Sequence, residues 1–333
     1  MQHHTPATER RPRSASARWI LTALIALSLG LTPAPAHAAS LQEVGRFGSN
    51  PGNLRMFRYV PDGLPAGRPP AVALHGCDRS AAAFDDETGW TKWAQQYGFA
   101  LLPPQQKAIN NLNSCFNWFQ PIDTTRGWGE ALSVKQMVDR MKSDTGSDAA
   151  RVYVTGLSAG GAMTSAMAAS HPDVFAGAAV VAGIPHDCAR NALTGLTCTS
   201  PGIDLGPQQW GDRVRAAHPG HAGPYPTMSV WHGSADTTVR PVNLTEIVEQ
   251  WTNVHHTDAI ADTSDTVQGY PHHVYRDGTG RAVVESHSVT GMTHGRPVDP
   301  GSGAAQCGVA SRYIPDANIC ASYWIGRFWG LTS

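Results

Sequence analysis

Short apolar runs alternate with helical patterns along most of this chain, and this alternation restricts the fold more than any other feature of the sequence. The apolar runs have the length and the β-branched content of buried strands. Buried strands that are separated by helices favour a mainly parallel sheet with helices on both faces. The sequence therefore predicts an α/β fold.

The expected strands are Arg55–Val60, Ala71–Leu74, Phe99–Leu102, Val152–Thr155, Ala178–Ala182, Thr227–Trp231 and Val283–Val289. The expected helices are Ala81–Tyr97, Glu130–Lys142, Ala159–Ser170, Pro241–Val254 and Ala317–Trp329. The polar stretch that contains Asp258, Asp262 and Asp265 is expected to be a solvated loop. Because no internal repeat or low-complexity linker interrupts residues 39–333, we expect them to form a single domain.

The first 38 residues have the pattern of a secretory signal peptide. Four arginines precede an apolar run from Trp19 to Leu31, and Ala-His-Ala at positions 36–38 fits a cleavage site. The run is shorter than the roughly 20 residues that span a bilayer, so an uncleaved anchor is the weaker alternative. We expect cleavage near Ala38 and a secreted protein, extracellular or periplasmic. Two adjacent arginines suggest twin-arginine export, but the residues that follow favour the general secretory route.

Charge and cysteine content narrow the possible functions. The chain has 25 Lys and Arg against 26 Asp and Glu, and its body contains no basic run, which argues against a nucleic-acid-binding protein. All six cysteines lie beyond the expected signal peptide. An even number of cysteines in an exported chain indicates disulfides, although the sequence alone does not decide how they pair.

The pentapeptide GLSAG at residues 156–160 has the G-x-S-x-G pattern. The run VYVT before it predicts a strand, and the small-residue stretch after it predicts a helix. A strand, a sharp turn and a helix form a nucleophile elbow, whose turn exposes the serine hydroxyl. Gly156 and Gly160 lack Cβ atoms and so avoid clashes around the turn. We expect Ser158 to be a nucleophile; an incidental serine in a glycine-rich connection is the alternative.

A serine nucleophile needs a base, and the base needs an acid that orients it. Asp236 closely follows the expected strand Thr227–Trp231, so we expect it to be the acid, with an ordinary turn residue as the alternative. His294 follows the last expected strand in a glycine-rich loop and is the expected base. His287 lies inside that strand and is expected to pack or to face solvent. The order Ser158, Asp236, His294 is that of the G-x-S-x-G hydrolases.

The reaction also needs donors for the negative charge that develops on the carbonyl oxygen. We expect the backbone N–H of Ala159, directly after the nucleophile, to be one donor. The N–H of Cys77, in the loop after the strand Ala71–Leu74, is the expected second donor. An incidental His-Gly turn is the alternative at this loop.

Adjacent histidine pairs occur at positions 255–256 and 272–273, which raises the question of a metal site. Neighbouring side chains point in different directions, and neither H-E-x-x-H nor C-x-x-C accompanies the pairs. We therefore expect no metal and no cofactor.

At these residues the sequence resembles the secreted polyhydroxybutyrate depolymerase family of esterases, whose relatives include feruloyl and acetyl-xylan esterases. The resemblance rests on LHGC (74–77), CFNWF (115–119), GLSAGGAM (156–163), HGSADTTV (232–239), GMTHG (291–295) and ICASYWIGRFWGL (319–331). It implies an α/β-hydrolase fold, a Ser–His–Asp triad and hydrolysis of short-chain polyester or ester bonds without a cofactor. Members that attack solid polymer usually carry a linker and a substrate-binding module. We expect neither here, so oligomers, amorphous polyester or soluble esters fit better.

Two local hypotheses follow. Cys77 and Cys115 form a disulfide that ties the oxyanion loop to the CFNWF segment, while Cys188 pairs with Cys198 and Cys307 with Cys320. Trp118, Phe119 and Trp128 line an acyl or polymer groove together with His75, although packing in the core is an equal alternative for the aromatic residues.

Three other functions use the same residues or scaffold. A carbohydrate-directed esterase would share the whole triad, and an acyltransferase would replace water by another alcohol. A secreted binding module would keep the fold without catalysis, which the presence of all three triad residues disfavours. Neither a nucleic acid nor a stable membrane anchor is expected as a partner.

Overall fold

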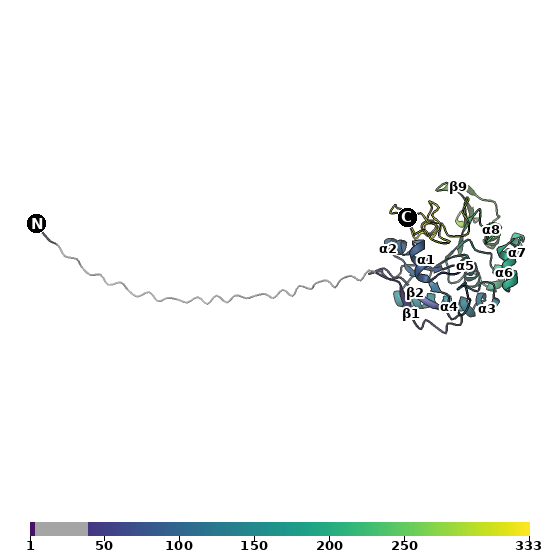
Figure 1. Ribbon diagram of the computed structural model, residues 1–333, viewed down its shortest axis with the longest axis horizontal. Helices are drawn as coiled ribbons and strands as arrows, with labels where there is room; N and C mark the ends of the chain where they lie inside the picture. Colours follow the sequence, from purple (N-terminus) through teal and green to yellow (C-terminus); the bar gives the residue numbers. More distant parts are fainter. Residues whose placement is uncertain (4–38) are drawn as a thin grey trace. The chain divides into compact units, whose positions relative to one another are not determined.

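The computed structural model describes residues 1–3 and 39–333. Nearly all of the expected signal peptide therefore lies outside the described residues. Within residues 39–333, an eight-stranded sheet has the order β4-β3-β6-β7-β8-β11-β10-β9, and its edge strand β9 is labelled in Figure 1. Strands β4 to β11 in this order are parallel to one another, and β10 and β9 are antiparallel at one edge. This is the mainly parallel α/β architecture that the alternating pattern predicts.

The strands of this sheet are β3 (Pro70–Leu74), β4 (Ala100–Leu102), β6 (Tyr153–Leu157), β7 (Gly177–Val181), β8 (Thr227–Gly233), β9 (Thr263–Val267), β10 (Tyr270–Arg276) and β11 (Ala282–Val289). A smaller antiparallel sheet contains β1 (Gln42–Val44), β2 (Arg55–Arg58) and β5 (Pro104–Gln105). The helices are α1 (Ala81–Thr88), α2 (Trp90–Tyr97), α3 (Pro121–Thr124), α4 (Gly129–Thr145), α5 (Ala159–Ser170), α6 (Ala192–Thr199), α7 (Pro207–Ala217), α8 (Val242–Val254) and α9 (Ala321–Phe328).

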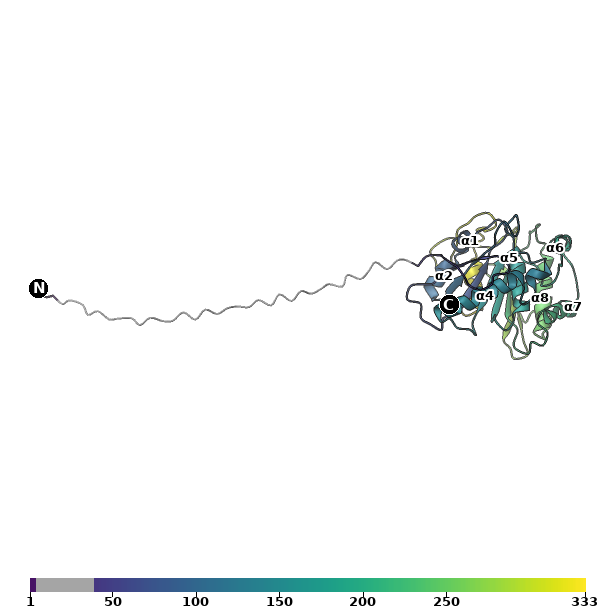
Figure 2. The ribbon, with the colours of Figure 1, turned by 90° about the horizontal axis from the view of Figure 1, so that it is seen from below.

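Helices cover both faces of the large sheet. Successive side chains of a strand point to opposite sides of the sheet, so each strand contributes to a core on each face. On β3, Val72 and Leu74 belong to a core that packs against α4, α5 and α8. Ala71 and Ala73 face a second core built with α1, α2 and α9 (Figures 1 and 2). Strand β3 is therefore buried and apolar along its whole length, which is why it reads as a continuous apolar run in the sequence.

Three elements differ from the sequence-based expectations. The expected helix Ala81–Tyr97 is two helices, because Gly89 has φ 74° and a Cβ there would lie 2.6 Å from the Cβ of Cys307. The closing helix begins only at Ala321. The expected loop around Asp265 is partly wrong, because β9 is an exposed edge strand paired with β10.

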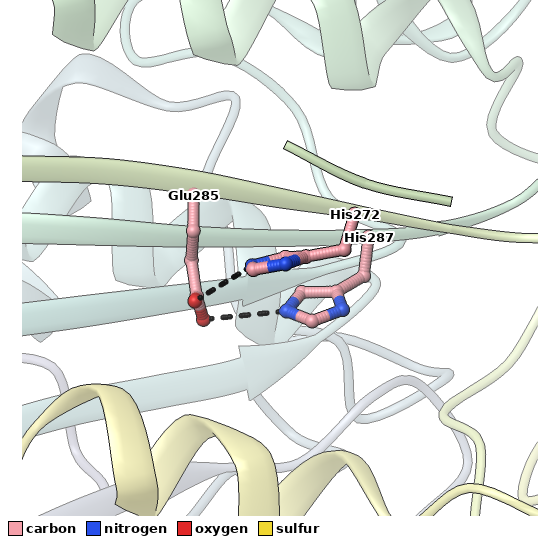
Figure 3. A group of neighbouring side chains, drawn as sticks. All are labelled: His272, Glu285 and His287. Carbon is pink, nitrogen blue, oxygen red and sulfur yellow. Dashed lines mark hydrogen bonds and ion pairs between the residues drawn. The ribbon is translucent and has the colours of Figure 1, made fainter. Parts of the chain in front are cut away.

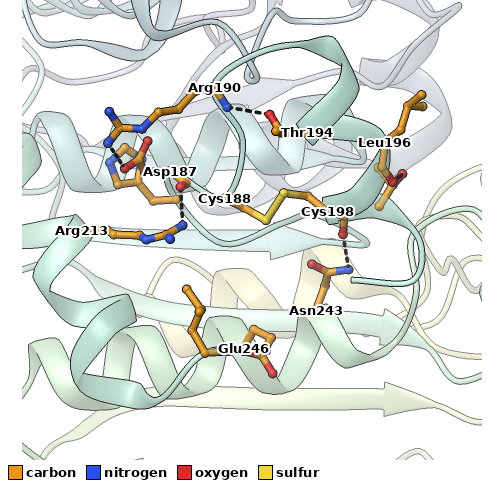
Figure 4. Close-up of a disulfide and its surroundings, with 12 residues drawn as sticks. Asp187, Cys188, Arg190, Thr194, Leu196, Cys198, Arg213, Asn243 and Glu246 are labelled. Atoms are coloured by element: carbon orange, nitrogen blue, oxygen red, sulfur yellow. Dashed lines mark hydrogen bonds and ion pairs between the residues drawn. A yellow bond between two sulfur atoms is a disulfide. The ribbon is translucent and has the colours of Figure 1, made fainter. Parts of the chain in front are cut away.

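All six cysteines lie among the described residues and are paired in three disulfides, Cys77–Cys115, Cys188–Cys198 and Cys307–Cys320. Figure 4 shows the second of these, which connects the loop after β7 to the last turn of α6. The carbonyl oxygen of Cys198 in turn accepts a hydrogen bond of 3.1 Å from the Asn243 side chain at the start of α8. The disulfide thus joins α6 to the loop after β7, and the hydrogen bond to Asn243 holds the end of α6 beside the start of α8.

Within the described residues, no helix is both long enough and apolar enough to cross a membrane.

Three buried histidines make the fold sensitive to acid. Burial lowers the pKa of His75, His171 and His186 to about 4. In the folded protein each ring therefore stays neutral at pH values below the ordinary pKa of histidine. In the unfolded chain they take up protons near pH 6.5. At these three positions the unfolded state therefore binds more protons between about pH 6.5 and pH 4, and the stability that they contribute decreases as the pH falls through this window.

We predict that the free energy of unfolding, measured by urea titration, falls as the pH is lowered from 6.5 to 4.5. Each histidine contributes up to about 1.4 kcal/mol per pH unit. His186→Gln should reduce the slope by one histidine's share, because the glutamine does not titrate. An identical slope in the wild-type protein and this variant would contradict the prediction.

Candidate active site

Ser158 occupies a sharp turn between β6 and α5. Its backbone has φ 57° and ψ −118°, a conformation that non-glycine residues rarely adopt. The Ser158 N–H donates a 2.9 Å hydrogen bond to the carbonyl oxygen of Val181, the last residue of β7. Its carbonyl oxygen accepts from the N–H of Ala162 in the first turn of α5. The strand and the helix therefore hold the strained residue from both sides.

The two glycines of the motif are required by close backbone contacts. A Cβ on Gly156 would lie 2.2 Å from the carbonyl oxygen of Gly160. A Cβ on Gly160 would lie 2.3 Å from the carbonyl oxygen of Leu74, at the end of β3. The first turn of α5 thus packs directly on the loop that follows β3, and the sequence predicts this role of the glycines.

The structure brings Ser158, Asp236 and His294 together. The distance from His294 Nε2 to Ser158 Oγ is 2.9 Å, and the distance from His294 Nδ1 to Asp236 Oδ2 is 2.7 Å. The side chain of Asp236 is fully buried and that of His294 is 9 % exposed, whereas Ser158 is partly exposed. Serine, imidazole and carboxylate form one continuous hydrogen-bonded chain that ends at a solvent-accessible hydroxyl.

Asp236 is held as a carboxylate by several donors. Its Oδ1 accepts hydrogen bonds of 2.8 and 2.9 Å from the N–H groups of Thr238 and Val239. Burial opposes ionisation, but hydrogen bonds from His232 and His294 outweigh it and hold the pKa of Asp236 far below its usual range. The carboxylate is therefore charged at neutral pH, and its hydrogen bond to Nδ1 fixes the orientation of the His294 ring.

His232 is a second imidazole at this carboxylate, and the sequence gives no sign of its role. Its Nε2–H donates to the carbonyl oxygen of Val239 at 2.8 Å, and Nε2 also lies 3.4 Å from Asp236 Oδ2. The residue is 1 % exposed and occupies β8, where it reads as part of an apolar strand. The turn of four residues that brings it back to Asp236 is visible only in the structure.

The loops that carry Asp236 and His294 are joined to each other. The N–H of Ala235 donates to the carbonyl oxygen of Met292 at 3.0 Å, and Ser234 Oγ accepts from the N–H of Gly291 at 2.9 Å. Both loops follow neighbouring parallel strands, β8 and β11, so they emerge at the same edge of the sheet. This pairing sets the distance between acid and base.

The loop after β3 lies opposite the imidazole. Cys77 is joined to Cys115 by a disulfide, and the N–H of Asp78 donates to the carbonyl oxygen of Asn113 at 2.7 Å. A cleft at the nucleophile is lined on one side by this loop and on the other by His294 and Tyr313. The N–H of Ala159 belongs to the first turn of α5, where helix N–H groups have no partner within the helix. Both expected oxyanion donors thus flank the serine.

The residues expected to bind substrate lie elsewhere. Trp118 and Phe119 form an edge-to-face pair packed against a small core with Cys198 and Trp210. Trp128 is 59 % exposed at the start of α4, outside the residues that line the cleft. For the first two residues the position agrees with the core-packing alternative.

His75 also lies outside the lining of the cleft. It is fully buried, its Nδ1–H donates to the carbonyl oxygen of Gly76 at 2.7 Å, and its Nε2 accepts from the N–H of Gln106 at 3.0 Å. Gln106 continues to Glu130, a buried carboxylate whose two oxygens also accept from the backbone and the side chain of Asn117. Burial raises the pKa of Glu130 to about 8. These buried hydrogen bonds connect the loop after β3 to Gln106, Glu130 and Asn117. The sequence does not predict them.

Among the described residues, one group has the composition of a metal site, namely His272, Glu285 and His287 (Figure 3). The two imidazole rings are stacked, with centroids 4.4 Å apart and planes 26° apart. Lone pairs in nearly parallel planes do not converge on one ion, as tetrahedral coordination requires. The position of His287, stacked on Trp231 at 3.7 Å, agrees with the expectation that it packs.

The same group reads better as an ion-pair network. His272 lies between two carboxylates. Its Nδ1 is 2.7 Å from Asp265 Oδ1, and its Nε2 is 3.3 Å from Glu285 Oε2, the contact drawn in Figure 3. Burial lowers the pKa of His272, but hydrogen bonds to Glu285 and Asp265 outweigh it and raise the pKa above its ordinary value. The three side chains of His272, Asp265 and Glu285 therefore form one hydrogen-bonded network between β9, β10 and β11.

Comparisons with known proteins identify the family and agree with the fold. The family described as Esterase PHB depolymerase matches residues 54–266. The chain is 53 % identical over 92 % of its length to poly(3-hydroxyalkanoate) depolymerase C of Paucimonas lemoignei, and covers 74 % of that protein. It is 38 % identical over 76 % of its length to feruloyl esterase B of Neurospora crassa, and covers 88 % of it.

A solved structure provides the corresponding comparison of folds. The acetyl xylan esterase from Aspergillus awamori superposes with a TM-score of 0.70 at 30 % sequence identity, over 77 % of this chain and 94 % of that one. The mainly parallel sheet with helices around it is thus an α/β-hydrolase fold. With a family match over more than half of its length, the chain belongs to the polyhydroxybutyrate depolymerase family of esterases and is a carboxylic-ester hydrolase.

Proposed function

We propose that the protein hydrolyses short-chain hydroxyalkanoate polyester or oligoester bonds through an acyl-enzyme on Ser158. The observation that carries this proposal is the hydrogen-bonded chain from Ser158 Oγ through His294 to Asp236, with distances of 2.9 and 2.7 Å. Such a chain lets the imidazole accept the serine proton as the new bond forms.

In the acylation step, Ser158 Oγ attacks the ester carbonyl carbon and His294 Nε2 takes its proton. The negative charge moves to the carbonyl oxygen, where the N–H groups of Cys77 and Ala159 stabilise it. Donors placed in this way are worth about 3 kcal/mol each in the transition state. The tetrahedral intermediate then collapses, and the protonated His294 gives its proton to the departing alcohol.

In the deacylation step, water takes the place of the alcohol. His294 accepts a proton from the water as its oxygen attacks the acyl carbon, and the second intermediate collapses to the free acid and Ser158. Asp236 stays ionised throughout and stabilises the imidazolium form, which agrees with its lowered pKa. The cycle needs no cofactor.

Several observations favour a polyester over a carbohydrate ester. Identity to the depolymerase is 53 %, against 38 % to the feruloyl esterase and 30 % to the acetyl xylan esterase. The cleft at Ser158 adjoins a second hollow that shares Thr238, His294 and Tyr313, so an extended ester chain could pass the nucleophile. Carbohydrate-directed hydrolysis is the second candidate, because the same residues would perform it.

Export of the protein is part of the proposal. Residues 1–38 have the pattern of a signal peptide, and we infer cleavage near Ala38. Disulfides that join all six cysteines form and persist in oxidising compartments. Both features support an extracellular or periplasmic location.

We predict that Ser158→Ala abolishes hydrolysis of p-nitrophenyl butyrate, because the variant lacks the attacking oxygen. Circular dichroism should show an unchanged fold, and a fluorophosphonate probe should label the wild-type protein but not the variant. Turnover at the wild-type rate in the variant would exclude Ser158 as the nucleophile.

We predict that Asp236→Asn lowers kcat by roughly three to four orders of magnitude, because the amide no longer holds the correct tautomer of His294. Asp262→Asn is the matched control, since Asp262 is exposed and accepts a hydrogen bond from the N–H of Arg276 at the sheet edge. Its kcat should equal that of the wild-type protein. Equal losses in the two variants would contradict the assignment.

A substrate panel tests the ester class. We expect faster product release from hydroxybutyrate oligomers and amorphous polyhydroxybutyrate than from methyl ferulate or acetylated xylan, measured at equal ester concentration by chromatography. Assays with an added acceptor alcohol would reveal acyl transfer. A clear preference for either carbohydrate-type ester would favour the second candidate.

A further inference from the structure

A positively charged side chain lies in the protein interior close to the catalytic base. Arg296 follows His294 by two residues and is 0 % exposed. Across the described residues, no carboxylate lies within ion-pairing distance of its guanidinium. Burial lowers its pKa to about 9, so the group still carries its charge at neutral pH. An unpaired buried charge is costly, and an apolar side chain of similar volume is often tolerated or stabilising instead.

The guanidinium contacts hydroxyls and aromatic faces rather than a counter-ion. Nη2 donates to Ser322 Oγ at 3.0 Å, and Nη1 donates to Thr155 Oγ1 at 3.4 Å. Its central carbon lies 5.5 Å from the ring centre of Trp90 and 6.0 Å from that of Phe84. Aromatic faces attract cations, which offsets part of the cost of burial.

These contacts join the parts of the chain that carry the reaction. Thr155 lies on β6, three residues before Ser158, so the side chain reaches from the loop of the base to the strand of the nucleophile. Ser322 Oγ donates to the carbonyl oxygen of Thr88 at 2.7 Å, which continues the link from α9 to the end of α1. One side chain thus connects four separate segments beneath the catalytic residues.

The loop that carries the base has little regular structure of its own. Residues 290–297 form turns and bends rather than a helix or strand. The N–H of Arg296 donates to the carbonyl oxygen of Tyr313 at 2.9 Å, and a Cβ on Gly295 would lie 2.7 Å from that same oxygen. The backbone of this loop therefore contacts the loop at Ser234 and Ala235 and the loop at Tyr313, and the Arg296 side chain adds an anchor toward β6.

We propose that Arg296 is a positioning residue, which fixes the loop of His294 against the strand of Ser158 and so maintains the distance between the base and the nucleophile. The proposal rests on the function proposed above. This role explains why a charged side chain is buried at position 296, where an apolar residue would cost less folding free energy. Hydrogen bonds from a planar guanidinium fix a direction, whereas an apolar contact does not.

The test compares Arg296→Met, which removes the donors, with Arg296→Lys, which keeps the charge but lacks the planar fork. With p-nitrophenyl butyrate, well below the melting temperature, we expect Arg296→Met to lower kcat by roughly ten- to a hundredfold, the effect of a misplaced catalytic group. KM should stay within about twofold, because the cleft itself is unchanged. Arg296→Lys should retain more activity than Arg296→Met.

The matched control is Arg327→Met on α9, where the guanidinium lies over Trp324 on an exposed part of the helix. Its kcat and KM should equal those of the wild-type protein. Ser322→Ala removes one partner of Arg296 and should give a smaller loss of kcat. In the double variant the two losses should be less than additive, because both act through one contact.

Fluorophosphonate labelling separates this role from simple stabilisation. If Arg296 positions the base, the labelling rate of Ser158 falls with kcat in variants that circular dichroism shows to be folded. Wild-type kcat and labelling rate combined with a lower melting temperature would overturn the proposal. If Arg296→Met does not fold, Arg296→Lys and Ser322→Ala decide in the same way. Failure of the proposed function is distinct, because Ser158→Ala would then keep its activity.

Discussion

The site depends on one strained residue between a strand and a helix. Ser158 keeps its positive φ because β7 and the first turn of α5 each form a hydrogen bond to its backbone, and because glycines on both sides leave room for the close contacts. Strain of this kind costs of order 1–3 kcal/mol and persists only where the surroundings fix it. The sheet, its two apolar cores and the glycine-mediated contact with the loop after β3 supply that constraint. The serine hydroxyl therefore lies within hydrogen-bond distance of the His294 imidazole.

Hydrogen bonds to a buried carboxylate hold the second part of the site. The carboxylate of Asp236 is buried, yet its hydrogen bonds outweigh the cost of removing it from water. His232, from inside β8, approaches the same oxygen Oδ2 as His294, while the N–H groups of Thr238 and Val239 hold the other oxygen. The loops of Asp236 and His294 are linked by the hydrogen bond between Ala235 and Met292. The distance between the two side chains is therefore set by the adjacent strands β8 and β11 that the loops follow. The geometry of the relay thus follows from the parallel register of β8 and β11.

The sequence predicts the architecture and the relay because both leave local signals. Continuous apolar runs mark buried parallel strands, and the glycine-serine pattern marks the elbow. The sequence gives no local signal where a structural feature is caused by contact with a segment far away in the chain. The helix break at Gly89 reflects packing against Cys307, more than two hundred residues away, and β9 is too polar and exposed to show an apolar pattern. Nothing in the sequence likewise marks Arg296 as buried, since fully buried arginines without a charged partner are rare.

The disulfide between Cys77 and Cys115 has a consequence for where the enzyme can work. It is the covalent connection between the loop that offers an oxyanion donor and the segment at residues 111–119. In a reducing environment this link opens, and the loop keeps only its hydrogen bonds and packing. Redox conditions therefore act on the catalytic geometry as well as on stability. A chain folded before it leaves a reducing cytoplasm would carry its nucleophile beside a less rigid anion-binding loop.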